Sequence, residues 1–244
     1  MYLCALMGHK KLIRFRAIDG FKNVLQKPEP EAMKGKWNEF FKNDNPITLE
    51  LACGKGEYSV NLGREHKDQN FIGIDIKGNR IYNGAKIALT EGLDNVGFLR
   101  IHIGHIAEYF APGEVSKIWI IFPDPFLKDG KAKNRLTHTR FLHHYQQILK
   151  KGATVNLKTD SKELHDFTLE MIAEHKCTIQ EHIVDVYGKG LATGPLAIQT
   201  FYEKMHLAEG RTIYFISFTL PDEMIPLPER FSKDTDEETD ATAE

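Results

Sequence analysis

The chain has 244 residues, of which 41% are hydrophobic and 27% are charged. This composition is typical of a globular protein and excludes a fibre or a fully disordered chain. No apolar run approaches the ~20 residues that a membrane-spanning helix needs. The three cysteines are far apart and lack C-x-x-C spacing, which argues against a disulfide scaffold or a zinc site and favours a reducing cytoplasm.

The net charge of −2 is unevenly distributed along the chain. The segment from Ser232 to Glu244 holds six acidic residues and one basic residue. We expect this tail to be disordered, because it is like-charged and poor in apolar side chains. Without it the chain has 31 basic and 28 acidic residues, a net charge of +3. The body of the chain is therefore mildly basic.

Residues 1–45 form a basic, poorly periodic extension that ends in a turn at Asn43–Pro46. Apolar β-type runs then alternate with helical patterns over residues 46–220, and residues 221–244 form a C-terminal tail. The predicted strands are Ile47–Ala52, Phe71–Ile76, Val96–Ile103, Lys117–Phe122, Thr154–Lys158, Cys177–Val186 and Thr212–Thr219. The predicted helices are Glu57–Glu65, Gly78–Glu91, Thr137–Lys151 (with Thr137 as its N-cap) and Ser161–His175. This alternation predicts one α/β domain with a doubly wound, mostly parallel sheet.

Ligands of such a sheet lie beyond the carboxyl ends of the strands. The first strand is followed by a turn with Gly54 and Gly56, where the backbone can approach a ligand closely. A dinucleotide fingerprint would have a third glycine where this chain has Ser59. The acidic Glu50 and Glu57 fit a cationic ligand, such as a sulfonium or an ammonium, better than a pyrophosphate. Taken alone, a G-x-G sequence is more often an ordinary strand-to-helix turn.

The second strand ends near Asp75, 21 residues after Gly54. A carboxylate at about this separation from a glycine turn can accept hydrogen bonds from the hydroxyls of a ribose. Asp75 alone is equally consistent with a solvated strand end. Together with the glycine turn, it favours adenosine binding.

The fourth strand runs into Pro123-Asp124-Pro125-Phe126. Two prolines make this loop rigid, so that it presents Asp124, and Phe126 offers a ring on which a base can stack. The basic residues that follow are Lys128, Lys131, Lys133, Arg135 and Arg140. Basic side chains beside an aromatic ring are typical of a polynucleotide-binding rim. The alternative interpretation is a stiff turn followed by a solvated charged loop.

Two later segments are also polar. Asp160 ends the fifth strand, where it is either a site residue or the N-cap of the next helix. Thr200–Glu203 lies between the last two strands and could close over a substrate. None of the eleven histidines forms an H-E-x-x-H pattern, and we expect no metal site.

In combination, these motifs resemble those of the bacterial tRNA (guanine-N7-)-methyltransferases, a family of class I S-adenosylmethionine-dependent enzymes. The motifs are L-E-L-A-C-G-K-G-E, F-I-G-I-D-I-K, F-P-D-P-F-x-K, R-L-T, L-K-T-D and T-x-Y-E, in the family's order and spacing. The resemblance covers most of the chain, from Lys34 to Tyr214. It implies a Rossmann-like fold with a seven-stranded sheet and an antiparallel strand near the C-terminus. It also implies methyl transfer from S-adenosylmethionine to N7 of a guanine in the tRNA variable loop, at position 46.

The resemblance also implies roles for individual residues. The cofactor-binding residues would be Glu50, Gly54, Gly56, Asp75 and Asp124; the catalytic residue would be Asp124; and the tRNA-binding residues would be Lys128, Asp160, Thr200, Phe201, Tyr202 and Glu203. The sequence departs from the family's pattern in three places, one of which is the basic run, interrupted here by Asp129 and Gly130. His102 stands where many members carry an aspartate near the adenine, so we assign no contact there, and Phe126 stands in place of a common tryptophan.

Two alternatives to this function are another class I methyltransferase, acting on a different base or on protein, and a catalytically inactive RNA-binding subunit with the same fold. A nicotinamide-dependent dehydrogenase is disfavoured by the missing third glycine. We expect a cytoplasmic enzyme whose partner is tRNA, with no membrane and no metal, as a monomer or homodimer.

Overall fold

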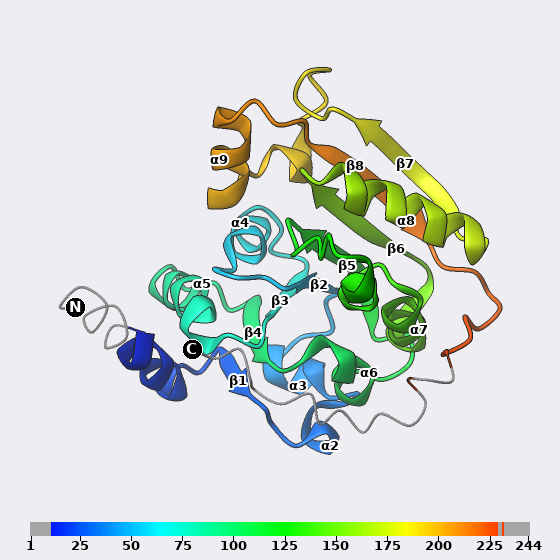
Figure 1. Cartoon of the computed structure of the whole chain (residues 1–244). Helices are drawn as coiled ribbons and strands as arrows, with labels where there is room; N and C mark the ends of the chain where they lie inside the picture. Colours follow the sequence, from blue (N-terminus) through cyan, green and yellow to red (C-terminus); the bar gives the residue numbers. More distant parts are fainter. Residues whose placement is uncertain (1–10, 229–230, 232–244) are drawn as a thin grey trace.

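A computed structural model describes residues 11–228 and residue 231. In this part of the chain eight strands form one sheet, in the order β1-β4-β3-β2-β5-β6-β8-β7, with helices on both faces (Figure 1). The strands are β1 (Val24–Gln26), β2 (Ile47–Leu51), β3 (Asn70–Ile74), β4 (Val96–Arg100), β5 (Val115–Ile121), β6 (Leu149–Thr159), β7 (Thr178–Val184) and β8 (Tyr214–Thr219). The helices are α2 (Pro30–Met33), α3 (Trp37–Phe41), α4 (Glu57–Glu65), α5 (Gly78–Thr90), α6 (Ile106–Tyr109), α7 (Thr139–Ile148), α8 (Lys162–Glu174) and α9 (Phe201–Ala208), and residues 11–17 are also helical. Short 3₁₀ segments are η1 (Ile18–Gly20), η2 (Ile103–His105), η3 (Asp129–Asn134) and η4 (Gly194–Ala197).

The order of the strands reverses between β2 and β5. β3 and β4 lie on one side of β2, whereas β5 and β6 lie on the other, and all of them are parallel. β8 runs antiparallel to both β6 and β7. The loops that leave β2 to β5 therefore emerge at one edge of the sheet, around the switch point at which open α/β sheets bind ligands.

The predicted α/β sheet and its antiparallel C-terminal strand are confirmed, but the sheet has eight strands instead of seven. The additional strand is β1, which pairs in parallel with β4 and places Val24 opposite Phe98. Trp37 in α3 is buried, stacks on Phe110 at a centroid distance of 5.0 Å, and donates a hydrogen bond to the carbonyl of Tyr109 at 2.9 Å. Residues before position 46 thus contribute a strand and part of the core. The acidic tail from Ser232 to Glu244, which we expect to be disordered, lies outside the described residues.

The helix predicted over residues 137–151 is shorter in the structure. α7 spans Thr139–Ile148, and it is capped by His138, whose ring nitrogen accepts a backbone N–H at 3.2 Å. The hydroxyl of Thr137, the predicted cap, lies instead 2.8 Å from the hydroxyl of Thr168 in α8. The residues after α7 lengthen β6, because they pair with β5.

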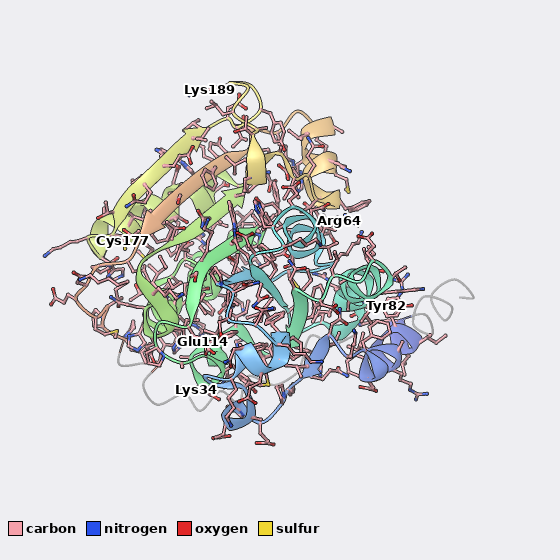
Figure 2. The ribbon with its side chains drawn as sticks, turned by 180° about the vertical axis from the view of Figure 1, so that it is seen from behind. Lys34, Arg64, Tyr82, Glu114, Cys177 and Lys189 are labelled. Carbon is pink, nitrogen blue, oxygen red and sulfur yellow. The ribbon has the colours of Figure 1, made fainter. Side chains whose placement is uncertain are left out.

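Apolar side chains fill a core on each face of the sheet. Figure 2 shows the side chains of the described residues as sticks around the ribbon. Leu49 and Leu51 of β2 belong to the core shared with α3, α6, α7 and α8, whereas Phe98 and Trp119 belong to the core shared with α4 and α5. Successive side chains of a strand point to opposite faces, so Glu50 lies on the α4 side of the sheet. Within residues 11–228, no helix is both long enough and apolar enough to cross a membrane.

Candidate active site

A pocket of about 250 Å³ lies at the carboxyl ends of β2 to β5. Residues that follow each of these strands line it, together with the start of α7: Ala52, Asp75, Ile76, Ile101, His102, Ile103, Pro123, Asp124, Phe126, Asn134, Leu136, Arg140 and Phe141. A second hollow, of about 480 Å³, shares Ile76, Ile101 and His102 with this pocket and extends to α2 and α6. The structure thus brings Asp75 and Asp124, predicted from two separate motifs, into one pocket.

Asp75 links the glycine turn to the loop after β3. One carboxylate oxygen accepts the N–H of Gly54 at 2.9 Å, and the other accepts the N–H of Lys77 at 2.8 Å. Burial raises the pKa of Asp75. Gly54 and Gly56 both have positive φ, and a Cβ at Gly56 would clash with the ring of Phe98. The turn therefore needs glycine at position 56, where the backbone packs against Phe98. The hydrogen bond from Gly54 holds the turn next to Asp75.

Glu50 is buried on the α4 side of β2. One of its oxygens accepts two hydrogen bonds from Ser59, from the N–H at 2.8 Å and from the hydroxyl at 2.5 Å. Burial raises the pKa of Glu50 to about 7. Glu50 is not among the residues that line the pocket. Its contacts join β2 to the first turn of α4 and thereby fix the glycine turn between them, and its predicted contact with a cofactor stays a prediction.

The loop after β5 exposes Asp124 and has an unusual backbone. Phe122 and Phe126 have φ values of 47° and 43°, in a region that side chains other than glycine rarely adopt. The N–H of Phe122 donates to the carbonyl of Lys158 at 2.9 Å, and the N–H of Phe126 donates to the Asp124 carboxylate at 3.1 Å. Such conformations cost about 1–3 kcal/mol each and persist only where their surroundings hold them.

Arg135 is hydrogen-bonded to the backbone of the loop that carries Asp124. Its guanidinium donates to the carbonyls of Pro125 and Phe126, each at 3.1 Å, and lies 4.6 Å from the ring centroid of Phe167. The sequence pattern places Arg135 in an exposed basic rim, but in the structure it is buried. Lys128, from the same run, is exposed beside the loop. Arg135 belongs to the R-L-T motif, but the motif does not indicate that its side chain is buried under the Asp124 loop, so sequence reasoning missed this role.

Asp160 lies at the end of β6, mostly buried. Its carboxylate accepts a hydrogen bond from Arg211 at 2.7 Å and lies 3.7 Å from a ring nitrogen of His206 in α9. The N-cap of α8 is Ser161, whose hydroxyl accepts the N–H of Leu164 at 3.1 Å. Asp160 is therefore not the cap and remains available to a site.

Thr200–Glu203 forms the start of α9 and lies against the glycine turn. Thr200 caps the helix, and the exposed rings of Phe201 and Tyr202 meet edge to face at 5.6 Å. The Lys55 ammonium lies 3.8 Å from the ring centroid of Phe201, whose N–H donates to Glu57 at 3.0 Å. The exposed ring of Phe201 thus lies beside the glycine turn, with the ring of Tyr202 next to it.

Glu203 differs from its neighbours, because its side chain is completely buried. Its carboxylate forms an ion pair with the Lys158 ammonium at 2.5 Å, and the side chain of Lys158 is also completely buried. Lys158 is the lysine of the L-K-T-D motif, but sequence reasoning assigned it no role. A charged residue in a strand that is otherwise buried is the signal that could have found it.

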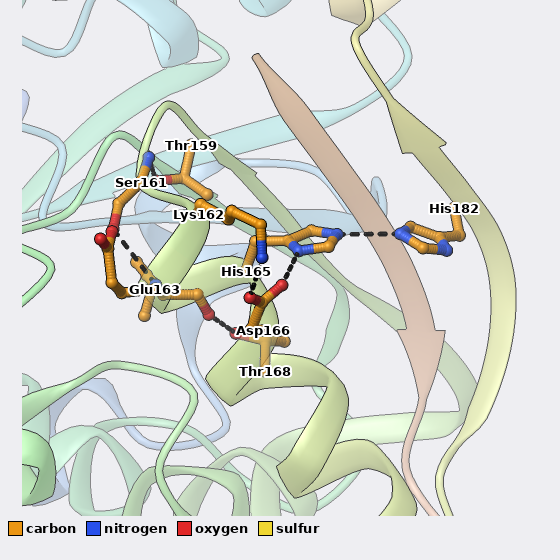
Figure 3. Close-up of polar contacts among 9 residues, drawn as sticks. Thr159, Ser161, Lys162, Glu163, His165, Asp166, Thr168 and His182 are labelled. Atoms are coloured by element: carbon orange, nitrogen blue, oxygen red, sulfur yellow. Dashed lines mark hydrogen bonds and ion pairs between the residues drawn. The ribbon is translucent and has the colours of Figure 1, made fainter. Parts of the chain in front are cut away.

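A polar cluster joins α8 to β7 (Figure 3). One ring nitrogen of the buried His165 lies 2.8 Å from the Asp166 carboxylate, and the other lies 2.9 Å from Nε2 of His182. Asp166 also pairs with Lys162 at 2.5 Å. Among the described residues, no group of three or more histidine, cysteine or acidic side chains is placed to hold a metal ion. Through the contact between His165 and His182, the cluster joins helix α8 to the edge strand β7.

The family model described as "Putative methyltransferase" matches residues 44–216 of the chain. The chain is 48% identical to the tRNA (guanine-N(7)-)-methyltransferase of Christiangramia forsetii over 226 residues, which cover 88% of this chain and 100% of that relative. Its identity to the protein of the same name is 45% in Bacteroides fragilis, covering 89% of this chain and 88% of the relative. The identity to the protein of the same name from Streptococcus thermophilus is 33%, covering 80% of this chain and 90% of the relative.

Solved structures of ribosomal RNA methyltransferases share the fold. The TM-score is 0.59 with the 16S rRNA methyltransferase KamB, at 11% identity over 77% of this chain and 94% of that one. It is 0.57 with the 30S ribosomal A1408 methyltransferase from an uncultured bacterium, at 18% identity over 81% and 98%. The family itself follows from the sequence relatives, which match nearly their full length: this chain belongs to the tRNA (guanine-N(7)-)-methyltransferases.

Proposed function

We propose that this chain transfers the methyl group of S-adenosylmethionine to N7 of a guanine in tRNA, in the variable loop at position 46. The observation that carries the proposal is the meeting of Asp75 and Asp124 in one pocket at the switch point of the sheet. Membership of the methyltransferase family supports it. We further propose that the reaction takes place in the cytoplasm.

The pocket fits S-adenosylmethionine, which supplies an electrophilic methyl group on a sulfonium. Each carboxylate oxygen of Asp75 accepts one backbone N–H and keeps a lone pair with which it can accept a ribose hydroxyl. Ile76, Ile101 and Phe141 offer an apolar surface to the adenine. Asp124 on the pocket wall adds a negative charge that complements a cationic ligand.

Guanine N7 is a hydrogen-bond acceptor with a free lone pair, so its attack on a methyl group needs no prior deprotonation. The residues of the chain therefore act mainly by placing the base in line with the methyl group, and such alignment can supply ~7–11 kcal/mol of a barrier. We assign this positioning to Asp124, which hydrogen-bonds the base or the cofactor's amino group. The fixed loop that carries Asp124 suits this role, because misplacement by about 1 Å can cost about 100-fold in rate.

On the substrate side, we assign tRNA contacts to Lys128, Asp160, Thr200, Phe201 and Tyr202. Glu203, predicted for the same role, is completely buried in an ion pair with Lys158, so we assign it no tRNA contact. Phe201 and Tyr202 are exposed rings on which a base can stack, and such stacking contributes about 1–3 kcal/mol per base. Lys128 is exposed next to the Asp124 loop, where its ammonium can meet a phosphate.

The test is incubation of unmodified tRNA with labelled S-adenosylmethionine, followed by mapping of the methylated nucleotide. We expect 7-methylguanine at position 46. Methyl transfer to another base or to protein would contradict the proposal in favour of a different class I methyltransferase. Calorimetry with S-adenosylmethionine should show binding, and an absence of binding would favour an inactive RNA-binding subunit. An Asp124→Asn variant with wild-type turnover would refute the role of Asp124.

A further inference from the structure

We propose that Lys158 is a positioning residue that holds the two sides of the active site together, the Asp124 loop on one side and residues 194–203 on the other. We call residues 194–203 the substrate segment. The inference rests on the proposed function, because it assigns the substrate segment to tRNA.

The ammonium of Lys158 fixes the substrate segment. It lies 2.5 Å from the carboxylate of Glu203, 2.8 Å from the carbonyl oxygen of Leu196 and 3.3 Å from that of Ile198. An ammonium has three N–H donors, so these contacts use all of them. The substrate segment is thus held at two carbonyls before α9 and at one carboxylate within it.

The backbone of Lys158 fixes the opposite side of the site. Lys158 lies in β6 and pairs with Ile121, the last residue of β5. Its carbonyl accepts the N–H of Phe122, the residue that leads into Pro123 and Asp124 and has a positive φ. One residue therefore contacts both the loop that presents Asp124 and the segment that is proposed to hold the base.

The arrangement is a poor way to gain stability. A completely buried ion pair must offset the desolvation of both charges, and apolar residues of similar volume often stabilise a protein as well or better. Burial lowers the pKa of Lys158. Oε1 of Glu203 also accepts the hydroxyl of Tyr187 at 2.7 Å, whereas Oε2 is buried without a hydrogen-bond partner among the described residues. The ion pair between Lys158 and Glu203 is therefore better explained by an active site that needs a fixed geometry than by the stability of the core.

A second contact fixes the same segment from the cofactor side, since Phe201 donates its N–H to Glu57, the first residue of α4 after the glycine turn. Lys158 and Glu57 thus hold the start of α9 from two directions. The exposed rings of Phe201 and Tyr202 lie between these two attachments. We infer that loss of the Lys158 contacts would shift these rings while leaving the cofactor pocket in place.

The test compares Lys158→Met/Glu203→Gln with Glu203→Gln alone. The double variant leaves no charge buried at the site, so we expect its urea midpoint to lie close to that of the wild type and above that of Lys158→Met. With a displaced segment, kcat/KM for tRNA should be about tenfold or more below that of Glu203→Gln. The dissociation constant for S-adenosylmethionine, measured by calorimetry, should equal that of the wild type, which a general loss of structure would not allow.

Tyr187→Phe provides a milder variant that keeps both charges. It removes one donor to Glu203, and we expect an about fivefold loss of kcat/KM for tRNA with unchanged cofactor affinity. Equal kcat/KM in the double variant and in Glu203→Gln would overturn the inference alone, and so would wild-type kinetics in Tyr187→Phe. A wild-type chain that methylates no guanine in tRNA would overturn the proposed function, and this inference with it.

Discussion

Replacement of Glu50 by glutamine should stabilise the folded protein at alkaline pH. Burial raises the pKa of Glu50 from 4.5 to about 7, so folding disfavours the ionised carboxylate. Below the unfolded-state pKa the group is protonated in both states and costs nothing. As the pH rises from 4.5 to about 7, the unfolded state has lost the proton while the folded state keeps it, and stability falls. At 1.36 kcal/mol per pKa unit, the full cost reaches about 3 kcal/mol above pH 7.

The assay is urea unfolding of the wild type and of Glu50→Gln at pH 5 and pH 8.5. How well the amide group fits the site also changes the free energy of unfolding, but by an amount that does not vary with pH. The measured quantity is therefore the difference in free energy of unfolding between Glu50→Gln and the wild type, compared between the two pH values. We expect the variant to gain about 2–3 kcal/mol relative to the wild type between these pH values. The matched control is Asp68→Asn at an exposed turn, which should change stability by less than about 0.5 kcal/mol. Parallel pH profiles for Glu50→Gln and the wild type would refute the reasoning.

Three further predictions concern single residues. Gly56→Ala should lower the free energy of unfolding by about 1–3 kcal/mol, since its Cβ would meet the ring of Phe98; unchanged urea denaturation would contradict this. Asp75→Asn should weaken S-adenosylmethionine binding about tenfold in calorimetry, and wild-type affinity would remove Asp75 from the site. Burial and the neighbouring His165 lower the pKa of His182, so the wild type should lose stability as the pH falls through about 6.5. The His182→Gln variant should lose less free energy of unfolding over the same pH range, as measured by urea unfolding. Identical dependence on pH in the two proteins would show that His182 does not cause the loss of stability.

The strands from β2 onward could be predicted, because buried parallel strands carry nearly continuous apolar runs. The sequence also predicts the helices α4, α5, α7 and α8, but not α6 and α9. α4 begins and ends at Glu57 and Glu65, as predicted. The pocket residues Asp75 and Asp124 could also be predicted, since each follows a recognisable strand. β1 escaped prediction because it has only three residues, too few to show a period.

Contacts between distant segments could not be predicted. Arg135 belongs to a run of basic residues whose pattern indicates a solvated rim, and only the fold shows that it lies under the Asp124 loop. Glu203 belongs to a polar motif that indicates an exposed contact, and only the fold buries it against Lys158. The periodicity of apolar residues indicates which face of a helix or strand is buried. It does not indicate which charged side chain of another element that face contacts.

Both edges of the sheet are poor templates for a further strand. β1 presents only three residues, and β7 exposes Glu181 and His182 along its length. The pairing of β7 with β8 also shifts register between Ile179 and Glu181. Short edges, polar side chains and irregular pairing are means by which proteins prevent edge-to-edge aggregation. We therefore expect neither edge of the sheet to pair readily with a strand of a second copy of the chain.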